Sequence, residues 1–266
     1  MREKRLAAAA APAEAHGRPA ASPGPVSGSP ATGFALRHWA AWAPGLERRE
    51  DWLAWARAPR LPAGEAAPAV IEIPAMLRRR ADRLGRMALA VLYQSTCPAA
   101  PIVYCSRYGE LERVAKLLGE LAATGGISPQ GFSVSVHNAI PGLYSIAMRE
   151  RENIQSLAAA EATPLAGLLD AAGLLADGEP VVRLVFCEEP VPAVFGPFAE
   201  PGDCPYAVLL ELAAGNDFRF EWAGPCPAGP APALPPALAV LEFLLGAAST
   251  ATVVAGRLSG RLSRGP

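Results

Sequence analysis

The stretch from residue 127 to residue 172 reads ISPQGFSVSVHNAIPGLYSIAMRERENIQSLAAAEATPLAGLLDAA. It begins with a loop, after which apolar and polar residues alternate, and this alternation predicts a β-strand over residues 132–140. A turn of small residues follows. A helix is then expected over residues 157–172, opened by alanines that permit close approach to its N-terminus. A turn of this kind suits a catalytic nucleophile, but here it holds alanine.

The segments around this stretch predict an α/β layer fold. Residues 101–106 form a short apolar strand, and a turn leads from them into a helical pattern at residues 111–123. Residues 180–187 are nearly all apolar, which predicts a strand in the interior of the sheet. Two further strands are expected at residues 206–212 and 218–222, with the spacing of a hairpin. The predicted fold class is therefore α/β, a layered sheet covered by helices.

The composition is that of a globular protein with a sizeable core. The chain has 266 residues, of which 51% are hydrophobic, and its formal net charge is -1. This charge gives no general attraction to nucleic acid, so no nucleic-acid partner is expected. The five cysteines are widely spaced, without a C-x-x-C pair or a nearby set of histidines. No metal site and no cofactor are predicted, and free thiols favour a cytoplasmic location.

Two segments have features of membrane or targeting sequences. The N-terminal residues MREKR resemble the basic start of a signal peptide, but Leu6 is the only strongly apolar residue before Pro12. No signal peptide is expected. Residues 234–256 are long enough to span a bilayer, but Glu242 and many small residues favour a packed helix. No membrane span is expected either.

The chain divides into four predicted parts. Residues 1–33 consist mainly of Ala, Pro, Gly and Ser without a hydrophobic period, which predicts a disordered tail. Residues 34–224 form the expected domain, and residues 225–236 form a Pro-rich linker. Residues 237–266 are expected to be a C-terminal helix and tail.

Four tryptophans, Trp39, Trp42, Trp52 and Trp55, lie close together in the sequence as two pairs joined by a Pro-Gly turn. Such aromatic residues usually anchor a packing surface. The favoured interpretation is a lid over the core of the domain itself. The alternative is a subunit interface, where indole rings often dominate the binding energy.

Residues 75–93 predict one helix with Pro74 at its first turn and an apolar face. The opposite face carries five arginines, namely Arg78, Arg79, Arg80, Arg83 and Arg86. Such a face can receive a phosphate, an acidic partner or the acidic helix of a carrier protein. The alternative is a solvated face whose arginines pair with local carboxylates.

Cys105 ends a predicted strand, at the edge of the sheet where α/β active sites often gather. It is therefore a candidate nucleophile, with His137 as a possible partner. A buried, inert thiol is the favoured interpretation. His137 and Asn138 could polarise a carbonyl group or hold a loop, and a hydrogen-bonded structural pair is preferred.

Four motifs carry a resemblance to a known family. They are W-x-x-W-x-P-G at residues 39–45, P-A-M-L-R-R-R-x-x-R-x-x-R at 74–86, S-R-Y-G-E-L at 106–111 and S-V-H-N-A-I-x-G-L-Y-S-I at 135–146. With them, the chain from Phe34 to Trp222 resembles the N-terminal half of a β-ketoacyl synthase of the thiolase-like superfamily. It is most similar to the short ketosynthase-like proteins of polyene and fatty-acid-type gene clusters. The resemblance implies a thiolase-like half that is truncated relative to full ketosynthases.

The resemblance also implies that the reaction centre is lost. In the family, a T-A-C-S-S motif places a cysteine at the helix N-terminus, where the thiolate is favoured and the thioester oxyanion is bound. Alignment of residues 167–171 with the family helix puts Ala160 at the nucleophile position, with Ala159 and Glu161 in the neighbouring registers. The family's downstream half supplies two histidines and a lysine, whereas this sequence has no histidine after His137. No catalytic residue is therefore predicted.

A silent subunit that pairs with a full-length, active ketosynthase is the function that the resemblance implies. Its role would be like that of a chain length factor in fatty acid, polyketide or aryl polyene biosynthesis, with an acyl carrier protein as a second partner. The expected partner or acyl-pocket face comprises Phe132, His137, Asn138, Ile140 and Tyr144. The expected carrier-protein contact comprises Arg78, Arg79, Arg83 and Arg86. Two alternatives remain, an independent acyl transferase or hydrolase that uses Cys105 and a carrier-protein docking module that uses the arginine face.

Overall fold

The computed structural model describes residues 32–200, 202–227 and 232–265. One mixed sheet of seven strands crosses them in the order β3-β2-β4-β5-β7-β6, and β1 pairs with β5. The predicted disordered tail and the segment considered as a signal peptide fall on residues 1–31, which lie outside the described residues. Thr32 and Gly33, also assigned to the tail, belong to β1. No helix in the described ranges combines the length and apolar character that a membrane span requires.

Five strands of the sheet run in one direction, namely β7 (Leu258–Arg264) and four strands from the first part of the chain. These four are β1 (Thr32–Trp42), β2 (Ile102–Cys105), β3 (Ile154–Leu157) and β4 (Val181–Glu188). β2 pairs in parallel with β3 and β4, and the long strand β5 (Tyr206–Pro225) is antiparallel to β4 and β1. β2 and the middle of β4 are buried, which explains their unbroken apolar sequences. The strands predicted at residues 101–106 and 180–187 are confirmed.

β5 is one strand of 20 residues, so the hairpin predicted within residues 206–222 is wrong. Its first half pairs with β4 and with most of β1, while the first three residues of β1 pair with residues 218–220. Its second half pairs with β7 (Leu258–Arg264), which forms a hairpin with β6 (Thr250–Ala255). Where β1 passes from Phe34 to Ala35, its partner on β5 changes from Phe218 to Ala213, so the intervening residues bulge out without reversing the chain. The expected C-terminal tail thus contains two paired strands.

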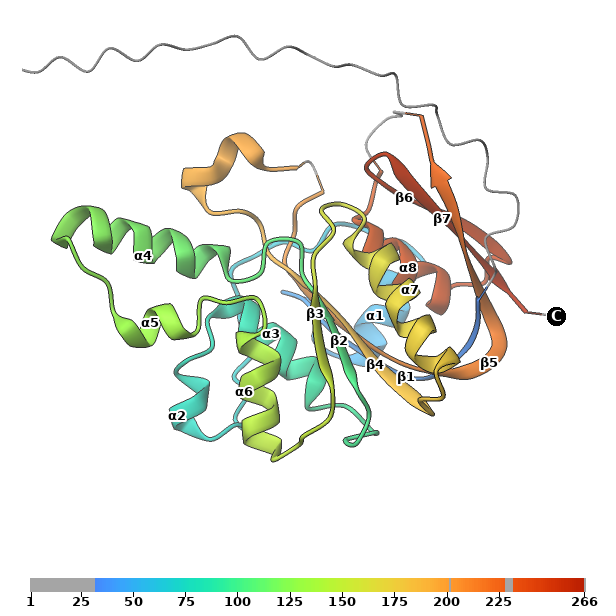
Figure 1. Cartoon of the computed structure of the whole chain (residues 1–266). Coiled ribbons are helices and arrows are strands. Elements are labelled where there is room, and N and C mark those ends of the chain that lie inside the picture. Colours follow the sequence, from blue (N-terminus) through green and yellow to red (C-terminus); the bar gives the residue numbers. More distant parts are fainter. Residues whose placement is uncertain (1–31, 201, 228–231, 266) are drawn as a thin grey trace, which may run out of the picture.

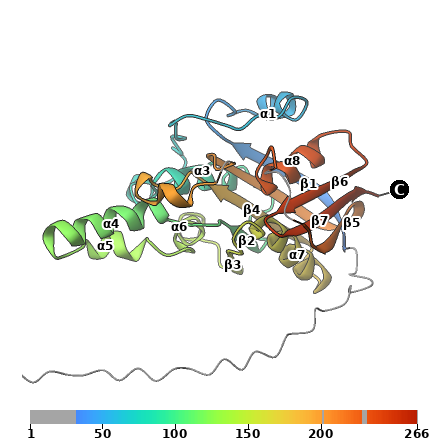
Figure 2. The ribbon, with the colours of Figure 1, turned by 90° about the horizontal axis from the view of Figure 1, so that it is seen from above.

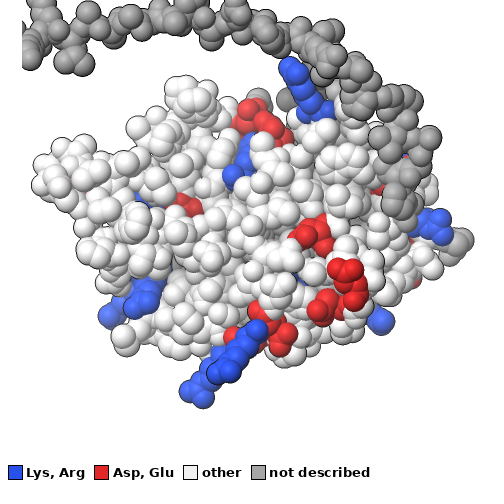
Figure 3. Space-filling view, in the orientation of Figure 1, with Lys and Arg blue, Asp and Glu red and all other residues white. Residues whose placement is uncertain are grey.

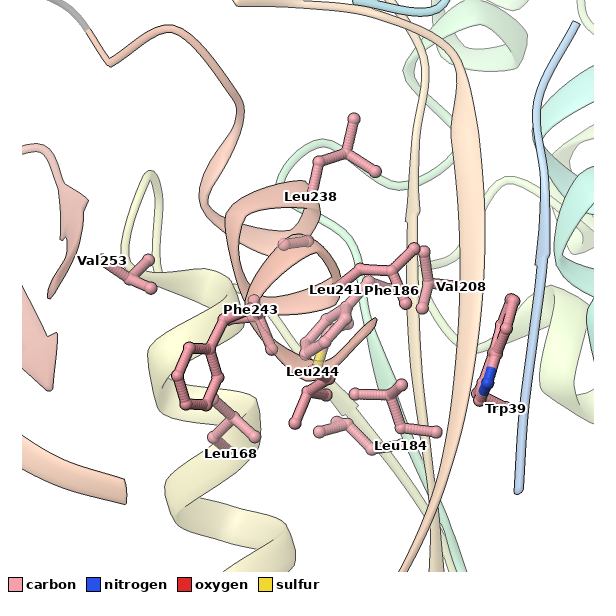
Figure 4. Packing of buried hydrophobic residues seen from close by; sticks show 14 of the residues in the cluster. Trp39, Leu168, Leu184, Phe186, Val208, Leu238, Leu241, Phe243, Leu244 and Val253 are labelled. Carbon is pink, nitrogen blue, oxygen red and sulfur yellow. The ribbon is translucent and has the colours of Figure 1, made fainter. Parts of the chain in front are cut away.

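Helices cover both faces of the sheet (Figures 1 and 2). On one face, α7 (Thr163–Ala176) and α8 (Pro236–Leu245) pack over an apolar cluster. On the other face, α3 (Arg83–Leu92) and α6 (Ala139–Met148) pack over a second cluster. In Figure 4, Leu241 and Leu244 of α8 lie beside Phe186 of β4 and Val208 of β5. The sheet is therefore the middle of three layers, which confirms the predicted fold class.

β1 and α1 (Arg49–Trp55) carry the four clustered tryptophans, and all four are buried. The turn between the two elements contains Gly45 at φ +73°, a left-handed conformation that glycine adopts without steric cost. The indole N–H of Trp52 donates to the carbonyl of Leu46 at 3.0 Å. The indole N–H of Trp55 donates to the carbonyl of Arg60 at 2.7 Å. The tryptophans close the chain's own core, and the favoured interpretation is confirmed.

The strand predicted over residues 132–140 is wrong. These residues form the end of the short helix α5 (Pro129–Ser133), a turn, and the start of α6. Ser128 caps α5 by accepting a hydrogen bond from the N–H of Gly131 at 3.1 Å, and Pro129 suits the first helical turn. α6 is helical because it buries one face against α3. The strand at the edge of the sheet is β3, and the following helix begins at Thr163 rather than at residue 157.

The single helix predicted over residues 75–93 is also wrong. The chain forms α2 (Ala75–Arg78), then a break, then α3. Asp82 precedes α3 in an extended conformation, and its carboxylate pairs with Arg113 at 3.0 Å. Arg113 comes from a distant part of the chain, so a local pattern could not show this contact. Asp also favours the position just before a helix over the helix interior. Met76, an apolar residue of the predicted helix, is 76% exposed on α2.

Residues 111–133 form an arm that projects from the body in Figures 1 and 2. The arm consists of α4 (Leu111–Thr124), which confirms the helix predicted there, and α5. No residue of α4 is buried, and the helix packs chiefly against α5. The arm and the residues just after it expose large apolar side chains, namely Leu118, Leu121, Ile127, Phe132 and Val136. Few charged side chains appear on the side of the arm seen in Figure 3.

Candidate functional site

Ala160 lies on the turn between β3 and α7. Its φ of +49° is in the left-handed region, which costs an L-residue about 1–2 kcal/mol. Thr163 holds the turn, because its hydroxyl donates to the carbonyl of Ala160 at 2.6 Å and accepts from the N–H of Ala159 at 2.8 Å. The N–H of Thr163 donates to the same carbonyl of Ala160 at 3.1 Å. Residue 160 is thus presented in a strained, fixed conformation just before a helix N-terminus.

A pocket of about 120 Å³ opens beside this turn. Ala160, Thr163 and Pro164 form part of its wall. The end of β4, the start of β5 and the residues between these strands form another part, while the Pro-rich residues 232–236 and the end of β6 complete it. A 3-10 helix, η1 (Ala193–Phe198), lies within the connection from β4 to β5. The pocket therefore sits at the carboxyl ends of β3 and β4, where sites of α/β proteins commonly form.

The polar part of the pocket lining is mainly acidic. Burial raises the pKa of Glu188 to about 8 and the pKa of Glu189 to about 7. The backbone N–H of Arg107 donates to the Glu188 carboxylate at 2.5 Å, and the Arg107 guanidinium pairs with Asp203. The charge of Arg107 is thus already matched. Near neutral pH Glu188 therefore keeps its proton in most molecules, and Glu189 keeps it in about half of them.

The side chains around this pocket are poorly suited to nucleophilic attack on an acyl group. Ala160 contributes a methyl group, and the hydroxyl of Thr163 is engaged as both donor and acceptor. Cys204 is 3% exposed, and burial raises the pKa of its thiol to about 12, so the thiol stays protonated. The turn at Ala160 thus keeps a backbone conformation suited to a nucleophile, but none of the described lining residues carries an activated nucleophile.

Cys105 is fully buried beneath α7, and a Cβ atom placed on Gly167 would lie 2.5 Å from its Sγ atom. Burial raises the pKa of this thiol, and Asp170 adds to the shift. His137 bonds elsewhere, since its Nε2 donates to the carbonyl of Ser106 at 2.8 Å. The favoured interpretation of Cys105 as a buried thiol is confirmed, and its surroundings do not support an independent acyl transferase or hydrolase.

The five residues predicted for a partner or acyl-pocket face are not brought together. Phe132 is 60% exposed on α5, and Asn138 is exposed just before α6. His137 is half-buried against the loop after β2. Ile140 and Tyr144 are each 1% exposed, in the core beneath α6. None of the five lines the pocket beside Ala160. The structure therefore does not support a single partner or acyl-pocket face made of these residues.

The predicted carrier-protein contact is also divided by the break between α2 and α3. Arg79 is exposed, whereas Arg78, Arg83 and Arg86 are half-buried. Arg83 pairs with Glu65 at 3.0 Å. Arg86 and Arg78 donate to backbone carbonyl groups of their own neighbourhood. These contacts favour the alternative interpretation, in which the arginines bind carboxylate and carbonyl groups of their own part of the chain.

The acidic lining of the pocket was missed by reasoning from sequence. Glu188 and Glu189 directly follow the clearest apolar strand, so they occupy the edge of the sheet where sites gather. That position is a signal which could have singled them out. Arg107 and Asp203 meet only through the fold, and no local pattern predicts the pair. Within the described ranges, no group of three or more His, Cys, Asp or Glu residues has the arrangement of a metal site.

A mixed sheet between two helix layers, with a strained turn leading into α7, defines this protein as a thiolase-like half. Residues 52–258 match the family model described as Beta-ketoacyl synthase, N-terminal domain, and the chain belongs to this family. The predicted family is thereby confirmed. No curated protein sequence matches this chain significantly.

Solved structures share the fold. One is described as a ketosynthase (ApeO) in complex with its chain length factor (ApeC) from Xenorhabdus doucetiae, and it matches with 28% identity and a TM-score of 0.76. The match covers 87% of this chain and 99% of that one. The ishigamide ketosynthase/chain length factor matches with 18% identity and a TM-score of 0.53, over 70% of this chain and 62% of that one. A β-ketoacyl synthase from Burkholderia phymatum STM815 matches with 14% identity and a TM-score of 0.52, over 73% and 65% of the two chains.

Proposed function

We propose that this protein is a non-catalytic ketosynthase-like subunit that pairs with an active, full-length ketosynthase, in the manner of a chain length factor. The observation that carries the proposal is the turn at Ala160. Its left-handed conformation and its Thr163 hydrogen bonds preserve a strained site before α7, where the residue has no reactive atom. A turn without such a role would be expected to carry glycine, which adopts this φ without strain.

The similarity to the Xenorhabdus doucetiae complex supports the same role. That structure contains a ketosynthase together with its chain length factor, and the matched chain is covered over 99% of its length. The matched chain is therefore close in length to the described part of this protein. The other two structures are covered over only 62% and 65% of their chains, so they share the fold of one part.

Two surfaces suit a protein partner. β3 is the edge strand of the sheet and pairs on one side only, with β2. Its other side offers backbone groups to which a strand of a partner can add. The arm adds exposed Leu118 and Leu121, and α6 adds Ile146, which is 62% exposed. Leu118 and Leu121 are three residues apart on α4 and so lie on one face of the helix, and adjacent exposed apolar side chains of this size are typical of an interface.

In this proposal, the pair works in the cytoplasm in fatty acid, polyketide or aryl polyene biosynthesis, and an acyl carrier protein delivers the acyl groups. The partner supplies the thiol that accepts the acyl chain and the groups that carry the condensation. This protein contributes surface to the pair and forms no covalent intermediate.

Co-expression with a candidate full-length ketosynthase tests the pairing. We expect affinity capture through a tag on this chain to retain the ketosynthase in a 1:1 ratio, and light scattering to give the mass of the heteromer. Leu121→Asp should weaken capture at least tenfold, because it places a charge in the apolar contact. Val194→Asp is the matched control, since Val194 is 71% exposed on η1, outside the proposed surface. A chain that stays alone in every mixture would refute the pairing.

Intact mass measurement tests the absence of catalysis. When an acyl carrier thioester is added to the heteromer, the acyl group should move to the ketosynthase thiol, with the free carrier thiol as the leaving group. The mass of the ketosynthase should rise by one acyl group, and the mass of this chain should not change. An acyl adduct on this chain would show that it is an enzyme in its own right.

A further inference from the structure

The root of the arm, residues 106–113, holds polar contacts that join the arm to the body. No residue of α4 is buried, so an apolar core does not fix the direction of the helix. The chain enters the arm through Gly109 at φ +55°, whose N–H donates to the hydroxyl of Ser106 at 3.0 Å. The root is therefore the place where the position of the arm is decided.

Arg113, in the first turn of α4, is the centre of this attachment. Its guanidinium pairs with Asp82 at 3.0 Å and donates to the carbonyl of Arg80 at 2.7 Å. Its Nε–H also donates to Oε2 of Glu110 at 3.3 Å, a hydrogen bond that the carboxyl group can accept in its protonated form. One largely buried side chain, 13% exposed, thus ties the arm to the segment before α3.

Glu110 is a group of this attachment whose hydrogen bonding is incomplete. Its side chain is 3% exposed, and its Oε1 atom has no hydrogen-bond partner among the described residues. The hydroxyl of Tyr104, on the adjacent β2, is likewise buried without a partner. A buried carboxylate with an unmatched oxygen is costly to ionise, because water would solvate it far better.

The groups around the root come from several elements. Arg113 of α4, Asp82 before α3, and Glu189 after β4 face Glu110. Glu189 in turn faces Arg83 and Asp82 on the side of α3, and Glu112 and Lys116 on the side of α4. The charged groups of the cluster are the carboxyl groups of Asp82, Glu110, Glu112 and Glu189 and the cations of Arg83, Arg113 and Lys116. Burial raises the pKa values of both Glu110 and Glu189 to about 7.

We propose that the root is a proton-linked hinge: the arm is held against the body while Glu110 and Glu189 carry protons and is released as they lose them. The linkage follows from solvation. In the closed position Glu110 is shielded from water and Glu189 is half-buried, so both favour the protonated form. In the open position water reaches them and they ionise at lower pH. A rise in pH therefore favours the open arm. For one carboxyl whose pKa is about 7 when closed and about 4.5 when open, the open-to-closed ratio rises about tenfold from pH 6 to pH 8.

Spin labels on the arm and on the body measure this ratio in the isolated full chain, without any ketosynthase, so the result stands apart from the pairing proposed above. The labels are placed by Glu120→Cys on α4 and Glu179→Cys before β4, both exposed, with the half-buried cysteines removed by Cys97→Ser and Cys226→Ser. We expect a narrow distance distribution at pH 6. At pH 8 a second, broader population should appear, and its ratio to the narrow population should be at least about tenfold larger than at pH 6.

Four variants identify the groups. Glu110→Gln, a neutral mimic of the protonated acid, should keep the arm closed at pH 8, and Glu189→Gln should act in the same direction from the β4 side. Arg113→Gln should open the arm at both pH values, because it removes the central pairing. Glu152→Gln, an exposed position away from the root, should leave the pH dependence unchanged.

Three outcomes would overturn the hinge. One is the same distance distribution at pH 6 and pH 8. Another is an unchanged pH dependence in both Glu110→Gln and Glu189→Gln. The third is a loss of helical circular dichroism over the same pH range, which would assign the change to unfolding rather than to movement of the arm.

Discussion

Residue 160 keeps a conformation that its side chain does not favour. Thr163 secures the turn by bonding to Ala159 and Ala160 at once, so the surrounding contacts outweigh the strain of one residue. A strained position at the mouth of a pocket is the usual mark of a functional site. Here the strain persists although Ala160 carries no functional group.

Ala160→Gly should stabilise the protein. Glycine adopts φ near +49° without a steric clash, so the free energy of unfolding should rise by about 1 kcal/mol. Urea unfolding followed by circular dichroism measures the change. The matched control is Ala122→Gly in α4, where φ is helical and glycine should lower the free energy of unfolding by about 1 kcal/mol. A destabilised Ala160→Gly variant would contradict the relief of strain.

At the scale of elements, α7 lies very close to the sheet at one point. Gly167 faces Cys105 of β2, and a Cβ atom there would come within 2.5 Å of the sulfur and 3.2 Å of Leu184. Both partners belong to the buried core and have no room to retreat. The glycine thus sets the distance between helix and sheet, and with it the position of the turn before α7.

Gly167→Ala should destabilise the protein by about 1–3 kcal/mol, because overpacking of the core outweighs the higher helix propensity of alanine. Cys105→Ala in the same chain should restore part of the loss by removing the sulfur. Gly173→Ala tests propensity alone, since Gly173 lies in the same helix with open space around it, and this change should stabilise by up to about 1 kcal/mol. Calorimetric melting of all variants decides between these expectations, and equal effects at both glycines would refute the close contact.

The strongly periodic or wholly apolar segments were predictable from sequence. The strands β2 and β4 and the helix α4 are all found where the pattern placed them. The local alternation at residues 132–140 was misleading, because burial of α6 against α3 decides its conformation. β5 was misread as a hairpin because its two halves are stabilised by different distant strands. In each failure a long-range contact overrides a local pattern.

The residues of the candidate site likewise include some that the sequence could predict and some that it could not. Ala160 could be placed by aligning residues 167–171 with the family helix, with Ala159 and Glu161 in the neighbouring registers, and its equivalence to the nucleophile stays a prediction. The carboxyl groups of Glu110, Glu188 and Glu189 could not be placed, because their raised pKa values arise from burial by segments far apart in the sequence.

At the scale of the whole molecule, buried carboxyl groups make stability depend on pH in an unusual direction. The pKa values of Glu110 and Glu189 rise to about 7 and that of Glu188 to about 8, from an ordinary value of 4.5. Between the ordinary and the raised pKa, the folded chain binds more protons than the unfolded chain. The contribution of these groups is therefore fully present below pH 4.5 and is lost as pH rises toward 8.

The free energy of unfolding should accordingly fall between about pH 5 and pH 8, by at most about 1.4 kcal/mol per pH unit for each group. Urea unfolding in buffers across this range measures the slope. Glu188→Gln should flatten the slope between pH 7 and pH 8, where Glu188 alone of the three still titrates strongly. Glu200→Gln, an exposed change, should leave the slope unaltered. Stability that rises with pH in this window would contradict the burial of these groups.

The pairing of β1 with β5 has a consequence for synthesis on the ribosome. Among the described strands, β1 pairs only with β5, and Trp42 meets Ala207. At about 5–20 residues per second, that partner emerges roughly 10–30 s after Trp42. During this interval the tryptophans that later close the core have no sheet to cover. The nascent chain therefore presents its most aromatic segment to chaperones well before the core can close.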